Sequence, residues 1–443
     1  MRRTGGWRKA ATEPMAAAWV SSLIFLITIA VLLTDWVHRT IVAWVGAAVM
    51  LAVGLAMGFY TQGQALAAID FNTLGLLLGM MMLMAMFRNT GAVEALAIVA
   101  AQKAGGNPVR LLAILGGLTT IISMLLNNAT VILLLAPVTI MIAAHLKISP
   151  VPLLMGEAFL SNVGGTATLI GDPPNVLIGS AAGLTFNDFL IVLLPVVLVA
   201  YYPTLWTIRW LFAAELQKRA GRSADLLPSR PRDSIKDRAG LTKLLVVLGL
   251  MLALFTLQDA LHLQLAVITF LGVALAMAWL LPNPGDLLKA VDWNVLLFFT
   301  SLFIAVGGLE AAGVLKAAAQ ALASFAGSHV LLTAVLLLWV AALLSAIVDN
   351  IPFVVAMIPI IKGLEAQGTT LEPLWWALAI GAGFGGNATP IAASANIITM
   401  ALSERAGYPI TFRMWLWSGS IVTLVSCAVG TLVFLVIFGL LKN

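Results

Sequence analysis

Long apolar stretches without a charge constrain the fold of this chain more than any other feature. A helix needs about 20 apolar residues to cross a bilayer. Backbone groups in lipid must bond within the protein, so such stretches form helices or a closed barrel. Barrel strands alternate polar and apolar residues, whereas these stretches are apolar on all sides. We therefore predict an all-α polytopic membrane protein with about 10–12 transmembrane segments. The candidate stretches are Trp19–Leu33, Ile41–Phe59, Leu74–Phe87, Phe189–Phe212, Leu241–Leu257, Leu263–Leu281, Val295–Leu309, Val330–Val348 and Met414–Leu441.

The composition agrees with a membrane location. Only 10% of the residues are charged, whereas soluble domains carry about 25%. No small-residue cleavage site follows the basic first 14 residues, so we interpret Trp19–Leu33 as a retained helix rather than a signal peptide.

The net charge of +5 comes largely from a basic tail and from the segment Lys218–Lys243. A nucleic-acid-binding segment is one interpretation. The positive-inside rule explains the segment more simply as a cytoplasmic linker at 213–240, and we expect no nucleic-acid partner. Five crossings in each half would then place both termini outside. The basic tail argues against that, and one more crossing would return it to the cytoplasm.

Cys427 is the single cysteine in the sequence. It excludes a disulfide within the chain and a thiolate metal site. No nucleophile–base pair and no metal-ligand cluster is evident either. We expect no metal, no cofactor and no enzymatic activity.

The sequence contains two copies of one pattern. Asn128 recurs as Asn350, 222 residues later, and Asn175 recurs as Asn396, 221 residues later. A nearly constant shift at polar, Gly and Pro positions indicates a duplicated chain. The further matches pair Asp70 with Asp292, Gly91 with Gly313, Pro137 with Pro359, and 165–168 with 386–389.

The duplication divides the chain into three parts. We predict a first half at 1–212, the basic linker at 213–240 and a second half at 241–443. Secondary transporters are built from such halves, with the substrate near the midplane where the halves meet. A channel or a membrane enzyme can also be duplicated, so the repeat by itself leaves those classes open.

Each half contains a polar break between two apolar runs, at 127–130 and at 349–352. We interpret each break as the tip of a re-entrant hairpin, because the apolar run that follows it is short for a full span. Backbone at membrane depth is tolerated only where it lines a protein cavity. The alternative is two ordinary helices joined by a surface turn, since Asn-Asn and Asp-Asn-Ile-Pro are good turn sequences.

A Gly-rich interruption follows each hairpin, at 164–175 and at 385–396. Each Gly costs a helix about 1 kcal/mol, and the prolines prevent the helix from continuing. A broken helix exposes free N–H and C=O groups, which bind small anions, neutral polyols or cations. The predicted substrate-binding residues are Asn127, Asn128, Thr130, Gly164, Gly165, Thr166, Thr168, Asn175, Asn350, Gly385, Gly386, Asn387, Thr389 and Asn396.

Asp172 and Asp349 are the carboxylates at these interruptions. Carboxylates at membrane depth are costly and usually functional, so we expect one of them to carry a proton or to help hold a cation. Asp172 can instead be a helix cap ahead of Pro173. Glu157 precedes the first interruption, and a functional role and a helix-end role have equal support.

The run from Gly164 to Asn175 resembles the ArsB/NhaD-type permeases of the ion transporter superfamily. That group includes arsenite efflux permeases, some sodium/proton antiporters and the pink-eyed dilution protein. Residues 345–352 and 385–390 reinforce the resemblance, which spans Asp70 to Trp415. It implies two inverted repeats, each with a re-entrant hairpin and a broken transmembrane helix. It also implies an elevator-like movement of a transport domain against a scaffold, and a homodimer.

The sequence leaves three alternatives for what the protein transports. Arsenite near neutral pH is an uncharged trihydroxide that needs hydrogen-bond partners, so the Asn, Thr and Gly residues favour proton-coupled arsenite or antimonite efflux. The second is a sodium/proton antiporter, and the third is an anion channel or organic-anion carrier. The Ser-Asn-Thr hairpin motif of sodium-coupled carboxylate carriers is not matched, which argues against carboxylates. The resemblance also implies an inner-membrane location and an ATPase subunit as a partner.

Overall fold

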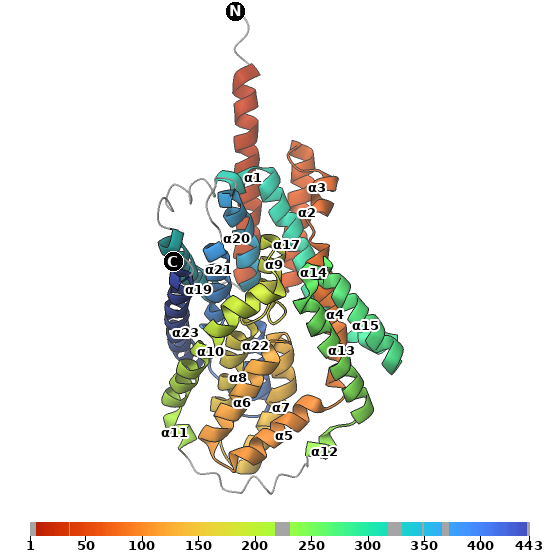
Figure 1. Ribbon diagram of the computed structural model, residues 1–443. Helices are drawn as coiled ribbons and strands as arrows, with labels where there is room; N and C mark the ends of the chain where they lie inside the picture. The colour runs from red at the N-terminus through yellow and green to blue at the C-terminus, as the bar shows by residue number, and fades with distance from the viewer. Residues whose placement is uncertain are drawn as a thin grey trace, which may run out of the picture.

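The protein consists of helices, shown in Figure 1 as a computed structural model that describes residues 6–34, 36–217, 231–317, 330–347, 350–365 and 372–440. Within these ranges no strand forms. Residues 218–230 of the predicted linker and Asp349 lie outside them. The helices of the first half are α1 (Gly6–Thr34), α2 (Arg39–Met57), α3 (Gln62–Ala67), α4 (Phe71–Arg88), α5 (Ala92–Ala104), α6 (Pro108–Ser123), α7 (Asn128–Leu146), α8 (Val151–Gly165), α9 (Pro173–Ala182), α10 (Phe186–Leu211) and α11 (Ala213–Leu216).

The second half repeats much of this order of long and short helices, with α14 as an additional short helix, and most of the residues that match α5 lie outside the described ranges. Its elements are α12 (Pro231–Ser234), α13 (Arg238–Thr256), α14 (Gln258–Leu261), α15 (Leu265–Leu280), α16 (Pro284–Ala290), α17 (Trp293–Ala311), α19 (Val330–Ile347), α20 (Asn350–Glu365), α21 (Glu372–Gly385), α22 (Ser394–Arg405) and α23 (Phe412–Leu440).

Nine of the described helices are long and apolar enough to cross a membrane, namely α1, α2, α4, α7, α10, α13, α17, α19 and α23. Eight of them coincide with apolar stretches predicted above, and the ninth predicted stretch forms the shorter α15. The chain is an integral membrane protein. One detail differs from the sequence prediction: α7, expected to be a short return arm, runs for 19 residues. Asn127 caps its start, and the helix continues through Pro137.

The matched residues of the two halves have the same structural roles. Asp70 begins α4 and accepts a hydrogen bond from the Thr73 amide at 3.0 Å, and Asp292 begins α17 in the same way. Such caps stabilise a helix by about 1 kcal/mol. Gly91 and Gly313 follow these two helices with φ angles of 73° and 77°, a conformation that side chains disfavour. The recurring residues are therefore the start and end signals of one helix, used twice.

The helices form two groups, whose members pack mainly against one another. The peripheral group holds α1–α4 and α13–α17, and in it α2 packs against α17 while α15 packs against α4. The central group holds α5–α10 and α19–α23, and in it α6 packs against α8 while α19 packs against α21. The same contact thus recurs between matched helices. In Figure 1, α2, α4, α13 and α15 lie together at the right, away from α10 and α23 at the left.

The hairpins and interruptions interlock across the two halves. The return helix α7 packs against α22 of the second half, and the return helix α20 packs against α9 of the first half. Long helices α10 and α23 pack against each other beside them. This exchange brings both interruptions to the middle of the central group.

Two matched glycines allow close helix contacts in the central group. A Cβ on Gly164 would lie 2.5 Å from the Thr120 carbonyl oxygen, and one on Gly385 would lie 2.5 Å from the Ala342 carbonyl oxygen. Each glycine therefore lets α8 or α21 approach the backbone of its partner helix. The predicted role of both residues in substrate binding stays a prediction.

We expect Gly164→Ala and Gly385→Ala each to destabilise the protein by about 1–3 kcal/mol, because the added methyl group must push two helix backbones apart. Gly249→Ala in α13 is the matched control, since a Cβ there has nothing within 4 Å. Heating in detergent followed by size-exclusion chromatography measures the apparent melting temperature. Melting temperatures equal to that of the control would contradict the packing role.

Candidate functional site

The first interruption is a loop between α8 and α9 that is held by one asparagine side chain. Asn175 Nδ2 donates to the carbonyl oxygens of Gly165, Thr166 and Thr168 at 3.3, 3.0 and 2.8 Å. These carbonyls follow the end of α8, where the helix supplies no further partners. Thr168 Oγ1 donates to the carbonyl oxygen of Met124 in the α6–α7 turn. The loop and the hairpin turn are therefore bonded to each other.

The second interruption, between α21 and α22, is also held by an asparagine side chain that donates to loop carbonyls. Asn396 Nδ2 donates to the carbonyl oxygens of Gly386 at 2.7 Å and Thr389 at 2.9 Å. Thr389 Oγ1 donates to the Ala346 carbonyl oxygen at 2.6 Å, near the end of α19. The repeated Thr and Asn of the sequence pattern thus stabilise irregular backbone inside the protein.

Four asparagines from both halves form a buried amide cluster at the centre. Asn162 lies in the middle: its Oδ1 accepts from Asn128 Nδ2 at 3.1 Å. Its Nδ2 donates to Asn387 Oδ1 at 2.8 Å and to Asn396 Oδ1 at 3.1 Å. All four side chains are at most 5% exposed. Each is occupied by protein partners, so the cluster connects the first hairpin tip and α8 to the second interruption.

The centre of this cluster departs from the internal repeat for a steric reason. The residue that matches Asn162 in the second half is Gly383, and the residue that matches Thr166 is Asn387. A Cβ on Gly383 would collide with Thr166 Oγ1. Two matched segments meet here, and the space beside Thr166 leaves no room for a side chain at position 383. The sequence comparison overlooked Asn162 because its partner in the repeat is a glycine.

Asp172 joins the first interruption to the second hairpin. It occupies the cap position of α9, is 5% exposed, and its Oδ2 accepts from Asn350 Nδ2 at 3.4 Å. Asn350 is the first residue of α20. Both are predicted site residues, and the structure brings them together; Asp349 lies outside the described residues.

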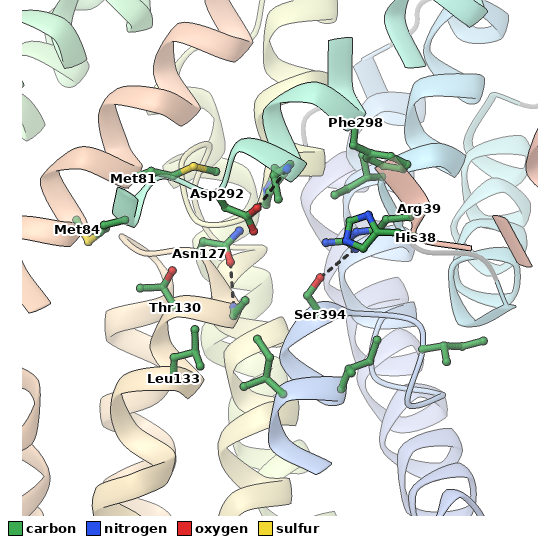
Figure 2. A pocket seen from close by; sticks show the side chains of 18 of the residues that line it. His38, Arg39, Met81, Met84, Asn127, Thr130, Leu133, Asp292, Phe298 and Ser394 are labelled. Atoms are coloured by element: carbon green, nitrogen blue, oxygen red, sulfur yellow. Dashed lines mark hydrogen bonds between the residues drawn. The ribbon is translucent and has the colours of Figure 1, made fainter. Parts of the chain in front are cut away.

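A cavity of about 620 Å³ separates the peripheral group from the central group. Figure 2 shows Asn127 and Thr130 on one wall, facing His38 and Arg39 on α2 across the space. Pro173 and Ser394, the first residues of the two broken-helix segments α9 and α22, also line it. Its remaining surface is mostly apolar, with Met81, Met84, Leu133, Phe298, Ile351, Ile391 and Ile397 among the lining side chains.

Most of the predicted substrate-binding residues do not line this cavity. Asn127 and Thr130 do, whereas Asn128, Thr166 and Asn387 lie in or beside the buried amide cluster. The interruptions contribute their helix starts to the cavity rather than their glycines.

The charged groups of the cavity come from the peripheral helices, and the sequence analysis did not single them out. Among the described residues they are Arg39 at the start of α2, Arg88 at the end of α4 and the cap Asp292, and the imidazole of His38 lies beside Arg39. Arg39 donates to Ser394 Oγ at 3.3 Å, and its guanidinium carbon lies 5.8 Å from the Phe298 ring centre. Arg39 and Asp292 each stand at the edge of an apolar stretch, where charges look like ordinary helix ends. Among the described lining residues, two arginines and one carboxylate give an excess of positive charge, which suits a negatively charged or hydroxylated solute.

Comparison with known proteins identifies the family. The citrate transporter family CitMHS matches residues 29–381. The chain belongs to this family. An uncharacterized transporter of Mycobacterium tuberculosis is 40% identical over 413 residues, which are 92% of this chain and 96% of that protein. The P protein of Mus musculus is 30% identical over 508 residues, and this chain spans 60% of its length. These likenesses indicate a membrane transport protein, and the finer ArsB/NhaD-type assignment stays a prediction.

The fold also resembles a solved transporter. The YdaH transporter of Alcanivorax borkumensis, whose crystal structure is described as having an unusual topology, superimposes with a TM-score of 0.61. The match covers 96% of this chain and 98% of the other at 13% sequence identity. At that identity the likeness concerns the fold alone.

We expect Asn162→Ala to destabilise the protein by about 3 kcal/mol or more. Three buried amide groups would lose a partner, and each unsatisfied group costs about 1–3 kcal/mol. Asn187→Ala is the control, because Asn187 makes a single exposed bond to the Thr256 carbonyl. Apparent melting temperatures in detergent compare the two variants. A loss no larger for Asn162→Ala than for the control would contradict the central role of the amide cluster.

Proposed function

We propose that this protein is a secondary transporter that carries a small solute through the cavity between the two helix groups. The main support for this proposal is the lining of the cavity. The start of α7, the starts of α9 and α22, and charged residues of the peripheral group all contribute to it. Substrate sites of duplicated transporters lie between such parts.

The movement that we propose is an elevator-type displacement of the central group against the peripheral group. The central group has its own buried polar network, and it is suited to move as one body. Arg39 bonds Ser394 across the cavity, between helices that belong to different groups. That contact would break and re-form as the cavity opens to either side of the membrane.

The cargo that we propose is a small organic anion with a carboxylate. Arg39 and Arg88 supply positive charge, and α9 and α22 point their N-terminal ends at the cavity. Helix N-termini favour anions, and a planar guanidinium matches a carboxylate with two hydrogen bonds. The description of the family as citrate transporters supports this choice. This choice differs from the arsenite cargo that the sequence favoured. The absent Ser-Asn-Thr motif argued against a carboxylate, but the positive charges of the cavity are the stronger argument.

Proton-coupled efflux of arsenite or antimonite is the second candidate. The hydrogen-bonding side chains Asn127, Thr130 and Ser394 at the cavity favour it, because a neutral trihydroxide needs donors and acceptors rather than charge. Sodium/proton antiport, a homodimer, an ATPase partner and an inner-membrane location stay predictions.

We expect Arg39→Gln to lower the uptake of radiolabelled citrate into proteoliposomes by about tenfold or more. A hydrogen bond to a charged group contributes about 1.5–3 kcal/mol, and 1.4 kcal/mol is about a factor of ten. Arg110→Gln, which changes an exposed arginine on α6, is the matched control. Arsenite, antimonite and sodium are tested singly in the same vesicles with a pH-sensitive dye. Uptake of citrate unaffected by Arg39→Gln would contradict the anion site, and responses to arsenite alone would favour the second candidate.

A further inference from the structure

Glu157 is a carboxyl group buried in the central group. It lies on α8 and is 0% exposed. Its Oε1 accepts a hydrogen bond from Thr139 Oγ1 on α7 at 2.5 Å. Its Oε2 is buried and has no hydrogen-bond partner among the described residues. Neither oxygen is used by the amide cluster or by the cavity, so the proposed substrate site leaves this group unexplained.

No charged side chain compensates Glu157 within hydrogen-bond reach in the described part of the chain. Six helices pack against α8. Their charged and titratable groups are Arg110 on α6, His145 on α7, Asp188, Tyr201, Tyr202 and Arg209 on α10, Glu372 on α21, Glu404 and Arg405 on α22, and Arg413 and Cys427 on α23. Arg110, Arg209, Glu372, Glu404, Arg405 and Arg413 are exposed, and none of the eleven has a hydrogen bond to Glu157.

The environment of Glu157 favours a group that exchanges a proton. An isolated buried carboxylate is costly, and neutralisation by a proton removes most of that cost. A single hydroxyl donor stabilises the ionised form in part, so neither state is locked by a full set of partners. A permanently ionised glutamate would be expected to have a cation beside it.

The position of Glu157 connects it to the parts that would move. Asn162, the centre of the amide cluster, lies five residues further along α8, which is about 7.5 Å of helix. Thr139 lies on α7, the helix whose N-terminal cap, Asn127, lines the cavity. The Glu157–Thr139 bond therefore joins the helix that carries the first hairpin tip to the helix that carries the first interruption.

We propose that Glu157 is the proton-binding site that couples transport to the pH gradient. This inference rests on the proposed function, and it replaces Asp172 and Asp349 as the proton carrier. Oε2 takes up one proton when the central group faces one side of the membrane and releases it when the group faces the other. Gain and loss of the proton change the bond to Thr139 and so the fit of α7 against α8.

Infrared difference spectroscopy tests proton exchange without any transport assay. Purified protein in detergent is compared at about pH 5 and about pH 9, and the C=O stretching band of a protonated carboxyl is assigned by its absence in Glu157→Gln. We expect a band that disappears reversibly as the pH rises. Thr139→Val, which keeps the carboxyl, should shift the pH midpoint upward, because the ionised form loses its donor. A band present or absent throughout the pH range would overturn the proposal.

Transport in proteoliposomes tests the coupling. In Glu157→Gln we expect uptake of labelled citrate driven by a pH gradient to fall about tenfold, the size of typical coupling between two sites. Citrate/citrate exchange at equal pH should stay within about twofold of wild type. Glu404→Gln, which removes an exposed carboxylate on neighbouring α22, is the control and should leave both activities unchanged.

The outcomes separate the two proposals. Wild-type protein that transports none of citrate, arsenite, antimonite and sodium would refute the proposed function, while the infrared titration still decides whether Glu157 exchanges a proton. Gradient-driven uptake that persists in Glu157→Gln would overturn the coupling role. If folded Glu157→Gln protein loses both citrate/citrate exchange and gradient-driven uptake, the coupling role is also overturned. Glu157 then has a structural role.

Discussion

The structure depends on satisfying backbone groups where two helices are interrupted inside the protein. Water does not reach these groups, and an unpaired buried carbonyl is expensive. The side-chain amides of Asn175 and Asn396 each donate hydrogen bonds to two or more of these carbonyl oxygens. Asn162 on α8, the helix that leads into the first interruption, donates to Asn387 and Asn396 of the second. Because these bonds hold the loops in place, the starts of α9 and α22 reach the cavity with their N-terminal ends available.

The need to satisfy buried backbone groups also limits which side chains can bind a solute. A side chain whose donors and acceptors are occupied by the protein cannot bind a solute without losing those bonds. The side chains of the amide cluster are occupied in this way by other protein groups. In the function that we propose, recognition falls to groups at the cavity wall, such as Arg39 and Thr130, and these come from both helix groups. A cavity built between two bodies can change its access when one body moves, whereas a cavity inside one body cannot.

Much of the fold was accessible from local patterns. The apolar stretches predicted most of the long helices, and the repeat located the caps Asp70 and Asp292. Two features escaped prediction for different reasons. The length of α7 was underestimated because Asn128 and Thr130, predicted as part of the hairpin tip, form the first turn of the helix itself. The importance of Asn162 was hidden, because the residue that matches it in the second half is Gly383, where a Cβ would collide with Thr166.

The sequence by itself determined that the chain is a duplicated, helical membrane protein with two polar interruptions per half. Hydropathy is a property of neighbouring residues, and the repeated Gly, Pro and Asn positions are separated by a nearly fixed number of residues. Both can therefore be recognised in the sequence alone. Only the tertiary structure decided what lines the cavity. Arg39 and Ser394 are separated by 355 residues and meet there. The isolation of Glu157 is likewise a property of six neighbouring helices. Charge and burial in such places arise from packing between distant segments, which no local pattern encodes.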